Sequence, residues 1–463
     1  MSLLAASGTA TDLLAARYQM ALSLGWHIVL AAFGVAFPLM IFVLHRSGLR
    51  GDKDALTLAK RWSKVAGVLF AIGAVSGTIL SFEMGMLWPG LMGPFGDVIG
   101  LPFALEGISF FTEAIFLGIY LYGWNRIPGR IHSLMLIPVA IAGATGTFFI
   151  LSVNSWMNTP EGFELVNGEI ANIAPIDAMF NAALWHEYVH MYVAAFIVVG
   201  FLVAAVYAAG LLRGRTDHYH RLGLWVPLAF AATAAIIQPL VGHVAGQRVA
   251  DLQPVKLAAM EGQWETEAGA DFTLGGYYRE GEGVVNGIRI PIDGLTSFIA
   301  QNNFDAVIEG LEAVPADERP PVNIVRFSFQ TMVGVGSALA VLGLVLGWWW
   351  WRRRDVTPPR LLLAAIVLAG PGSVLALEAG WVTTEVGRQP WIVYEITRTA
   401  DAVTDVSWIW ASFGVIAFVY GLLTIAAVVV LRAMTNSWRA GEEPQAPYGP
   451  PEPLEAGEPE PAR

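Results

Sequence analysis

Residues 375–391 read LALEAGWVTTEVGRQPW, and the rest of the chain is best interpreted from this stretch. It begins inside an apolar run, residues 361–379, which is long enough to cross a bilayer as a helix. Glu378 lies near the end of that run, and Glu385 and Arg388 follow it. A carboxylate inside a membrane helix is costly and indicates a function: it holds a proton, pairs with a cation or ligates a metal. The alternative is a helix-end carboxylate that reaches the interface, and this stretch alone leaves both interpretations open.

The composition of the whole chain is that of a polytopic membrane protein. Of its 463 residues, 55% are hydrophobic and 14% charged, and the mean hydropathy is +0.55. The net charge of -11 comes largely from one loop and the tail, so nothing suggests nucleic acid. The absence of cysteine excludes iron–sulfur clusters, thioether-linked haem, thiolate copper centres and disulfides. The first apolar stretch is full length and lacks a cleavage site, so we expect a retained helix, not a signal peptide.

The apolar segments predict an all-α protein with nine transmembrane helices. No internal repeat is visible. The predicted spans are 15–44, 65–82, 101–123, 132–153, 184–212, 222–245, 324–351, 361–380 and 407–431.

The Lys and Arg content of the loops orients these helices. The first, third, fifth and seventh loops are basic, whereas the second and fourth, residues 83–100 and 154–183, contain neither Lys nor Arg. Because basic loops stay cytoplasmic, the N-terminus is expected outside and the C-terminus in the cytoplasm.

The same assignment divides the chain into four parts. Helices 1–6 occupy residues 1–245, and helices 7–9 occupy 324–432. Between them, residues 246–323 form the one large extracytoplasmic loop, with a helix-compatible start and a glycine-rich, turn-containing region. The acidic, proline-rich residues 433–463 are expected to form a disordered cytoplasmic tail.

The eight histidines fall into two groups by position. One group, in or beside cytoplasmic loops, is expected to be solvated: His45, His132, His218 and His220. The other lies inside spans or at their outer ends, where an imidazole needs a partner: His27, His186, His190 and His243.

Several potential metal ligands are expected at one level, in the outer half of the bilayer. His27 lies roughly 15 Å from the outer end of helix 1 at the α-helical rise, and Met332 is about nine residues into helix 7. His186 begins helix 5, and Glu378 ends helix 8. Helix 3 adds Glu106 and Glu113, which are seven apart and therefore share a face.

Imidazole, thioether and carboxylate without thiolate fit haem iron, although core filling is the commoner role of any single methionine. A haem–copper oxidase needs an adjacent histidine pair, and none exists here. A cytochrome b of the quinol–cytochrome c reductase type needs histidines about thirteen apart on two helices, and that spacing is also absent.

Six motifs in order together resemble subunit I of the cytochrome bd quinol oxidases, over nearly the whole chain. They are YQMALSLGWH ending at His27, LEG with FFTEAIFLGIYLYGW around residues 105–124, NSWMNTP from Asn154, KLAAMEGQWET from Lys256, FQTM ending at Met332, and EAGW with GRQPW from Glu378.

The resemblance implies three haems and two substrates, quinol and oxygen. His186 and Met332 match the axial ligands of a low-spin haem b, and His27 and Glu378 match ligands of two high-spin haems. The carboxylates Glu106 and Glu113 match groups that supply protons to the oxygen site. Lys256 and Glu261 match the quinol-binding pair of the extracytoplasmic loop, called the Q-loop, which is short here.

The family also implies a bacterial cytoplasmic membrane, a homologous subunit II and a small single-helix subunit. Quinol would be oxidised outside and oxygen reduced to water with cytoplasmic protons, which generates membrane potential without pumping. Three departures stand out. Gln330 replaces an Arg two residues before the methionine, Glu106 and Glu113 are seven instead of eight apart, and the Q-loop is the short form. Relatives with a short Q-loop leave the third haem open between haem d and haem b.

Two other classes of protein compete with this interpretation. A secondary transporter would use intramembrane carboxylates as proton relays, but it commonly has an inverted repeat and broken helices. An assembly subunit would carry no cofactor. A reduced-minus-oxidised spectrum separates the three, because haem bands are expected for the oxidase subunit alone.

Overall fold

The computed structural model describes residues 2–353, 357–406 and 408–441. Within this part of the chain, nine helices are long and apolar enough to cross a membrane, as predicted. They are α1 (Ser2–Gly48), α2 (Lys53–Leu87), α3 (Pro89–Tyr122), α4 (Gly129–Leu134) with α5 (Leu136–Asn158) as one span, α7 (Leu184–Leu212), α8 (His218–Leu252), α11 (Val322–Arg353), α12 (Arg360–Gly387) and α14 (Ile409–Arg439).

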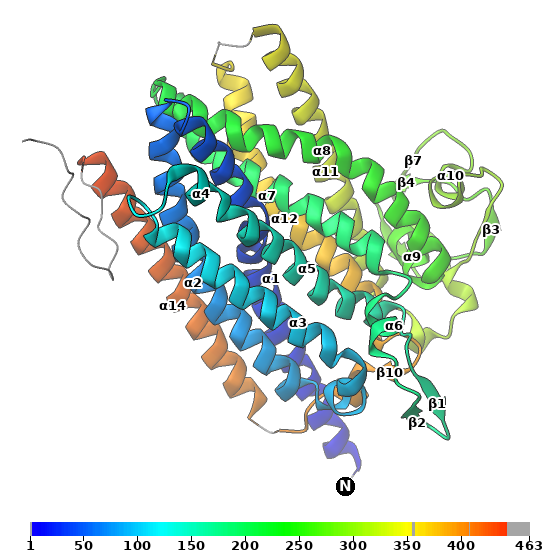
Figure 1. Ribbon diagram of the computed structural model, residues 1–463. Coiled ribbons are helices and arrows are strands. Elements are labelled where there is room, and N and C mark those ends of the chain that lie inside the picture. Colours follow the sequence, from blue (N-terminus) through cyan, green and yellow to red (C-terminus); the bar gives the residue numbers. More distant parts are fainter. Residues whose placement is uncertain (1, 354–356, 407, 442–463) are drawn as a thin grey trace, which may run out of the picture.

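The shorter elements lie mostly at one end of this bundle (Figure 1). They are β1 (Glu164–Val166), β2 (Glu169–Ala171), α6 (Pro175–Met179), α9 (Pro254–Glu261), β3 (Glu267–Ala268), β4 (Thr273–Leu274), β5 (Tyr277–Arg279), β6 (Gly283–Val285), β7 (Ile288–Arg289), α10 (Leu295–Gln301), β8 (Val307–Ile308), η1 (Leu311–Ala313), η2 (Ala316–Glu318), β9 (Trp391–Val393), β10 (Thr397–Arg398) and α13 (Thr399–Ala402).

The long helices form two groups of four, each closed into a ring of packed neighbours. In the first, α1 packs on α2, α2 on α3, α3 on α5, and α5 on α1. In the second, α7 packs on α8, α8 on α11, α11 on α12, and α12 on α7. The groups meet where α1 and α5 contact α7, and α14 lies outside, against α1 and α2 (Figure 1). A four-helix ring can hold a cofactor between side chains of facing helices.

The prediction that residues 83–100 form the second loop is wrong, because nearly all of this segment is helical. α2 continues to Leu87, and Trp88 separates it from α3, which has Pro89 at its first position. Proline is tolerated there because the first helical N–H groups have no intrahelical partner. The new turns of α3 bury one apolar face in the core: Leu91, Phe95, Val98 and Ile99.

Two histidines expected to be solvated are buried. His45 and His132 are 1% and 2% exposed, and both contact Tyr120 on α3. The Nδ1 atom of His45 lies 2.8 Å from the Tyr120 hydroxyl, and His132 donates to the Tyr120 carbonyl at 2.7 Å. The two side chains therefore join α1 and α4 to α3. His218 is exposed, as expected, and pairs with Asp52 at 3.0 Å.

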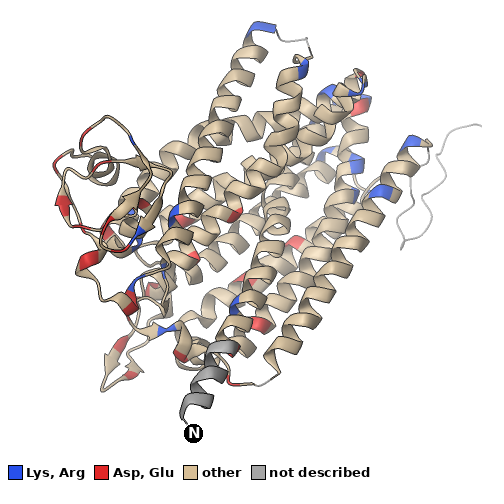
Figure 2. Ribbon diagram, turned by 180° about the vertical axis from the view of Figure 1, so that it is seen from behind, with Lys and Arg blue, Asp and Glu red and all other residues tan. Residues whose placement is uncertain are grey.

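The segment between α8 and α11 forms a lobe of paired strands beside α9, with glycine-rich turns as expected. Its pairs are β3 with β8, β4 with β7, and β5 with β6, all antiparallel. Gly276 has a φ of +71°, and a Cβ there would approach the backbone nitrogen of Gly287 to 2.6 Å, so glycine is required. Figure 2 shows most Lys and Arg positions at the bundle end away from this lobe.

α14 continues through Arg439, so the start of the predicted tail is helical. The rest of that prediction, residues 442–463, lies outside the described residues.

Candidate functional site

A cavity of about 430 Å³ lies inside the first ring of helices. Three of its lining residues can carry chemistry: His27 from α1, and Glu106 and Glu113 from α3. Most of the remaining lining is apolar, from α1, α2, α3 and α5, with Met191 of α7 and Trp381 of α12 closing it. The structure thus brings three of the predicted site residues together in one largely apolar space.

The imidazole of His27 is oriented by α2. Its Nδ1 atom lies 2.7 Å from the hydroxyl oxygen of Ser76, and that hydroxyl donates to the carbonyl of Gly73 at 3.0 Å. Because the Ser76 proton is used, its oxygen accepts from the Nδ1–H of His27, which leaves Nε2 with a free lone pair. Gly77 makes room for the ring, since a Cβ there would lie 3.1 Å from Cε1. In this tautomer the Nε2 atom is available to ligate a metal, while Nδ1 is held by a hydrogen bond.

Glycines on α1 make room for two predicted carboxylates. A Cβ at Gly34 would lie 2.9 Å from Oε1 of Glu113, and a Cβ at Gly25 would lie 3.1 Å from Oε2 of Glu378. Glu378 is half-buried and approaches α1 from α12, outside the lining of the cavity. Both acids therefore point towards α1, from opposite sides.

In the second ring, α7 carries His186 and α11 carries Met332, and these two helices face each other across the ring. The Nδ1 atom of His186 is buried and has no hydrogen-bond partner among the described residues. Gly380 of α12 makes room for Met332, since a Cβ there would lie 2.9 Å from the sulfur. An orphaned imidazole and a thioether on facing helices match the donor set of a low-spin haem.

The other candidate histidine on α7, His190, is directed elsewhere. It packs against Gly242 of α8, where a Cβ would lie 3.5 Å from Cε1, and its Nδ1 atom is also buried without a partner. His243 is near the lobe, with Nε2 3.3 Å from the side-chain oxygen of Asn302.

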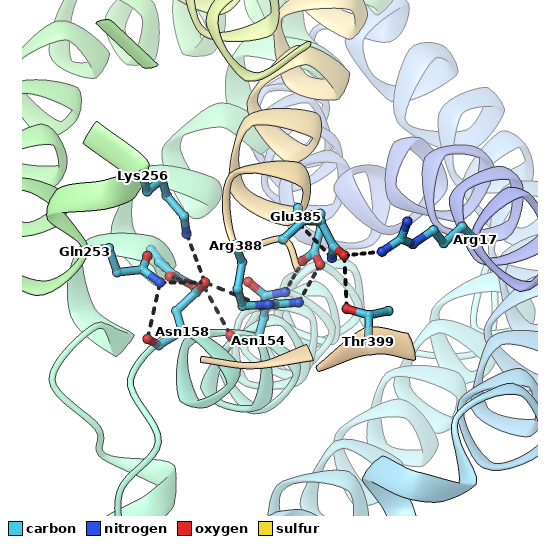
Figure 3. A network of polar contacts seen from close by, with 10 residues as sticks. Arg17, Asn154, Asn158, Gln253, Lys256, Glu385, Arg388 and Thr399 are labelled. Carbon is cyan, nitrogen blue, oxygen red and sulfur yellow. Dashed lines mark hydrogen bonds and ion pairs between the residues drawn. The ribbon is translucent and has the colours of Figure 1, made fainter. Parts of the chain in front are cut away.

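Lys256 lies inside a buried polar network, shown in Figure 3. Its ammonium donates to Oδ1 of Asn158 at 2.9 Å, and Asn158 donates to Glu187 at 2.8 Å. Arg388 extends the network, because it donates to Glu385 at 2.7 Å and lies 3.4 Å from the same Asn158 oxygen. Lys256 is only 3% exposed, so its ammonium is held inside the protein.

The cost of desolvation decides the charge of the two loop residues. Burial lowers the pKa of Lys256 to about 7, against the opposing field of Glu187. Burial likewise raises the pKa of Glu261 to about 7, while Arg326 acts in the opposite direction. Both groups can therefore exchange protons near neutral pH.

Arg326 of α11 attaches the lobe to the bundle. Fully buried, it donates to the backbone oxygens of Glu261, Thr273 and Gly275, the last at 3.0 Å. One turn further along α11, Gln330 donates to the Thr273 oxygen at 3.0 Å and accepts from the Gly275 nitrogen at 2.8 Å. The family resemblance led us to expect an Arg at position 330. The glutamine found there forms two hydrogen bonds to the lobe and helps to attach it to α11.

Five residues of this network were not predicted as site residues: Glu187, Glu385, Asn154, Asn158 and Arg388. Glu187 could have been found, because an ionisable residue inside a span indicates function by itself. Glu385 follows the apolar run of α12. Asn154, Asn158 and Arg388 belong to the motifs NSWMNTP and GRQPW, but no sequence pattern shows that these motifs meet. Asn154 donates to Glu385, and this contact joins α5 to α12.

Fold and site together define a polytopic membrane protein whose two helix rings enclose histidine, methionine and carboxylate side chains suited to redox cofactors. A family model for cytochrome bd terminal oxidase subunit I matches residues 15–438. The chain belongs to this family, whose members are quinol-oxidising, haem-containing terminal oxidases, and the predicted resemblance is confirmed.

Individual relatives agree with this assignment. A putative cytochrome bd menaquinol oxidase subunit I of Bacillus subtilis is 36% identical, over 91% of this chain and 96% of the relative. A cytochrome bd-II ubiquinol oxidase subunit 1 of Escherichia coli is 26% identical, over 92% and 96%. The solved bd oxidase of Geobacillus thermodenitrificans superposes with a TM-score of 0.84 and 37% identity, covering 92% of this chain and 98% of that one.

Proposed function

We propose that this chain is the haem-bearing subunit that oxidises membrane quinol at the outer face and reduces oxygen to water. Three haems are proposed: a low-spin haem b held by His186 and Met332, and two high-spin haems held by His27 and Glu378. One high-spin haem is of b type and the other of d or b type. When bound, these haems supply one-electron transfer and oxygen reduction.

The single observation that carries this proposal is the state of the two imidazoles inside the helix rings. His27 presents a free Nε2 beside a cavity of about 430 Å³, and the Nδ1 atom of the partly buried His186 is buried without a hydrogen-bond partner among the described residues. Buried imidazoles without partners are rare in native structures, because their desolvation is costly. A haem iron would supply a partner for an imidazole in each ring.

Quinol oxidation is assigned to Lys256 and Glu261, which hold the substrate and take its proton. The ammonium of Lys256 donates a hydrogen bond to one quinol oxygen, and the carboxylate of Glu261 accepts the proton as the electron leaves. The Oε2 atom of Glu261 is buried and has no hydrogen-bond partner in the part of the chain that the structure describes, so it is available to a ligand. Its pKa of about 7 suits a base at neutral pH.

Proton delivery to the oxygen site is assigned to Glu113 and Glu106. Both line the cavity on one face of α3, whose far end approaches the basic end of the bundle. Protons drawn from the cytoplasm along α3 and the neighbouring helix would reach oxygen, while quinol protons leave outside. Turnover would therefore build a membrane potential without a pump.

This topology requires an N-terminus outside and a C-terminus in the cytoplasm of a bacterial cytoplasmic membrane. Residues 246–323 would form the extracytoplasmic quinol loop, between helices 1–6 (1–245) and helices 7–9 (324–432). The uneven distribution of Lys and Arg supports this orientation. As bd oxidases are membrane complexes with a subunit II, we propose that it covers part of the exposed apolar surface, together with a small single-helix subunit.

A reduced-minus-oxidised spectrum of the purified oxidase, combined with haem extraction, tests the proposal. We expect a low-spin b signal, high-spin signals and three haems per chain. A purified complex that turns over with fewer haems on this chain would contradict the assignment.

A further inference from the structure

Outside the proposed site, a second polar cluster lies between α1, α2 and α14. It consists of Gln19 and Ser23 from α1, Glu83 from α2 and Tyr420 from α14, none more than 2% exposed. The amide of Gln19 donates to Oε1 of Glu83 at 2.9 Å. The Ser23 hydroxyl is near both the Glu83 carboxylate and the Tyr420 hydroxyl, but with neither does it form a hydrogen bond of standard distance and angle. Nothing in the proposed reaction uses these side chains.

Four polar atoms of this cluster are buried without a hydrogen-bond partner among the described residues. They are Oε1 of Gln19, Oγ of Ser23, Oε2 of Glu83 and the hydroxyl of Tyr420. A single orphaned atom can reflect local misfit, but four on converging side chains are unusual, because native proteins pair almost all buried polar groups. The two carbonyl-type oxygens accept hydrogen bonds, and the two hydroxyls also donate them.

We infer that this cluster is a binding site for ordered water. A buried water makes about three hydrogen bonds to otherwise unsatisfied polar groups, and four such groups converge here. A carboxylate, an amide oxygen and two hydroxyls match the mixed donor and acceptor character of water.

The position of the cluster relative to His27 and the cavity indicates a role in water movement. On α1, Gln19, Ser23 and His27 follow one another at intervals of four residues, so they share one face. On α2, Ser76 and Glu83 are seven apart and also share a face. Because Ser76 contacts His27, the two polar faces form a seam from the cluster to the cavity. The other end of the seam, at Glu83, is one turn from the end of α2.

Water is the product of oxygen reduction, and it must leave an interior that is otherwise apolar. The cluster is thus a water-binding site on the path by which product water leaves the protein. This role depends on the proposed reduction of oxygen beside His27, whereas the existence of the water site does not.

Hydroxyl-radical footprinting of the purified oxidase complex in ¹⁸O-labelled water tests the site, because radicals form from bound water and oxidise adjacent side chains. Tyr420 should be labelled despite its burial. Tyr120 is the matched control, since it is equally buried but its hydroxyl is paired with His45. Equal labelling of the two tyrosines would overturn the water site.

Two variants test the role. Glu83→Met should abolish labelling of Tyr420 and slow oxygen reduction several-fold, with an unchanged haem spectrum, whereas Glu83→Gln should retain both labelling and turnover. If Glu83→Met loses the label but turns over normally, the outward path is wrong. A His27→Ala variant that still reduces oxygen would instead contradict the proposed function.

Discussion

The ammonium of Lys256, on the extramembrane helix α9, donates a 2.9 Å hydrogen bond to the side chain of Asn158 at the end of α5. Asn158 in turn donates to Glu187, the residue after His186. The proposed quinol site is therefore joined through one amide to the span that carries the proposed haem ligand. The neutral side chain of Asn158 lies between the Lys256 ammonium and the Glu187 carboxylate. It therefore binds the lysine without a direct ion pair between the two charges.

Quinol oxidation should have a bell-shaped pH dependence centred near pH 7. The pKa of Lys256, lowered to about 7, means that its ammonium is lost as the pH rises through 7. The pKa of Glu261, raised to about 7, means that its carboxylate forms over the same range. Lys256→Met should remove the alkaline limb, and Glu261→Gln the acidic limb with a rate loss of about 10²-fold or more. Steady-state quinol kinetics across pH measure this.

An artificial donor that bypasses the loop is the control, and it should be oxidised normally by both variants. Asn158→Asp sharpens the test, because a carboxylate beside the ammonium should move the alkaline limb up by about one unit or more. The contrary outcome is an alkaline limb that Lys256→Met abolishes but Asn158→Asp leaves at the same pH. Asn158 would then have no effect on the pKa of Lys256.

His186→Ala and Met332→Leu should each remove the low-spin b signal and stop electron entry from quinol. The reason is that an iron with two strong axial ligands is low-spin, and loss of either ligand ends that state. Optical difference spectra measure the change. His190→Ala is the matched control, since His190 faces α8. Loss of the low-spin signal in His190→Ala, with its retention in His186→Ala, would exchange the two assignments.

Glu378→Gln and His27→Ala should each remove a high-spin signal and abolish oxygen reduction, while the low-spin haem survives. Glu385→Gln is the comparison, because Glu385 lies two turns further along α12 and is already bound by Arg388 and Asn154. Spectra with haem counts decide between the two carboxylates. A Glu378→Gln variant with full haem content, beside a Glu385→Gln variant that has lost a haem, would transfer the ligand role to Glu385.

Glu113→Gln should slow oxygen reduction by about tenfold or more, because a positioned proton donor would be lost. Turnover of the unmodified complex in vesicles should build a membrane potential, read with a voltage-sensitive dye. Turnover without a potential would show that protons do not arrive from the cytoplasmic side.

Arg326→Gln should loosen the extramembrane lobe, because the buried guanidinium holds three backbone oxygens of that segment. Hydrogen bonds from charged groups contribute about 1.5–3 kcal/mol each. Limited proteolysis of the purified complex should cleave the lobe faster than in the unmodified chain. Arg279→Gln removes an exposed pair with Glu282 and should leave the cleavage rate unchanged.

Some features of the fold followed from local pattern, whereas others did not. The nine apolar runs predicted the long helices, because the bilayer leaves a spanning segment no other way to satisfy its backbone. Residues 83–100 misled the prediction, since their glycines and prolines are typical of loops. Pro89 occupies a helix start and Pro94 a helix interior, and the buried apolar face of α3 outweighs both signals.

The candidate site divides in the same way. The six motifs identified the family from sequence, and an ionisable residue in an apolar run was enough to select Glu113 and Glu378 as candidates. His45 and His132 were assigned to solvent because their positions near basic loops say nothing of Tyr120, which buries them.

By itself, the sequence determined the number and order of the spans, the family and the residue types available to each helix. The tertiary structure alone decided which of these residues meet: Lys256 with Asn158, His27 with Ser76, and Glu83 with Gln19. The physical reason is that span length and composition depend on neighbours along the chain. Contacts between helices depend on how each helix is rotated and packed, which side chains distant in the chain determine together.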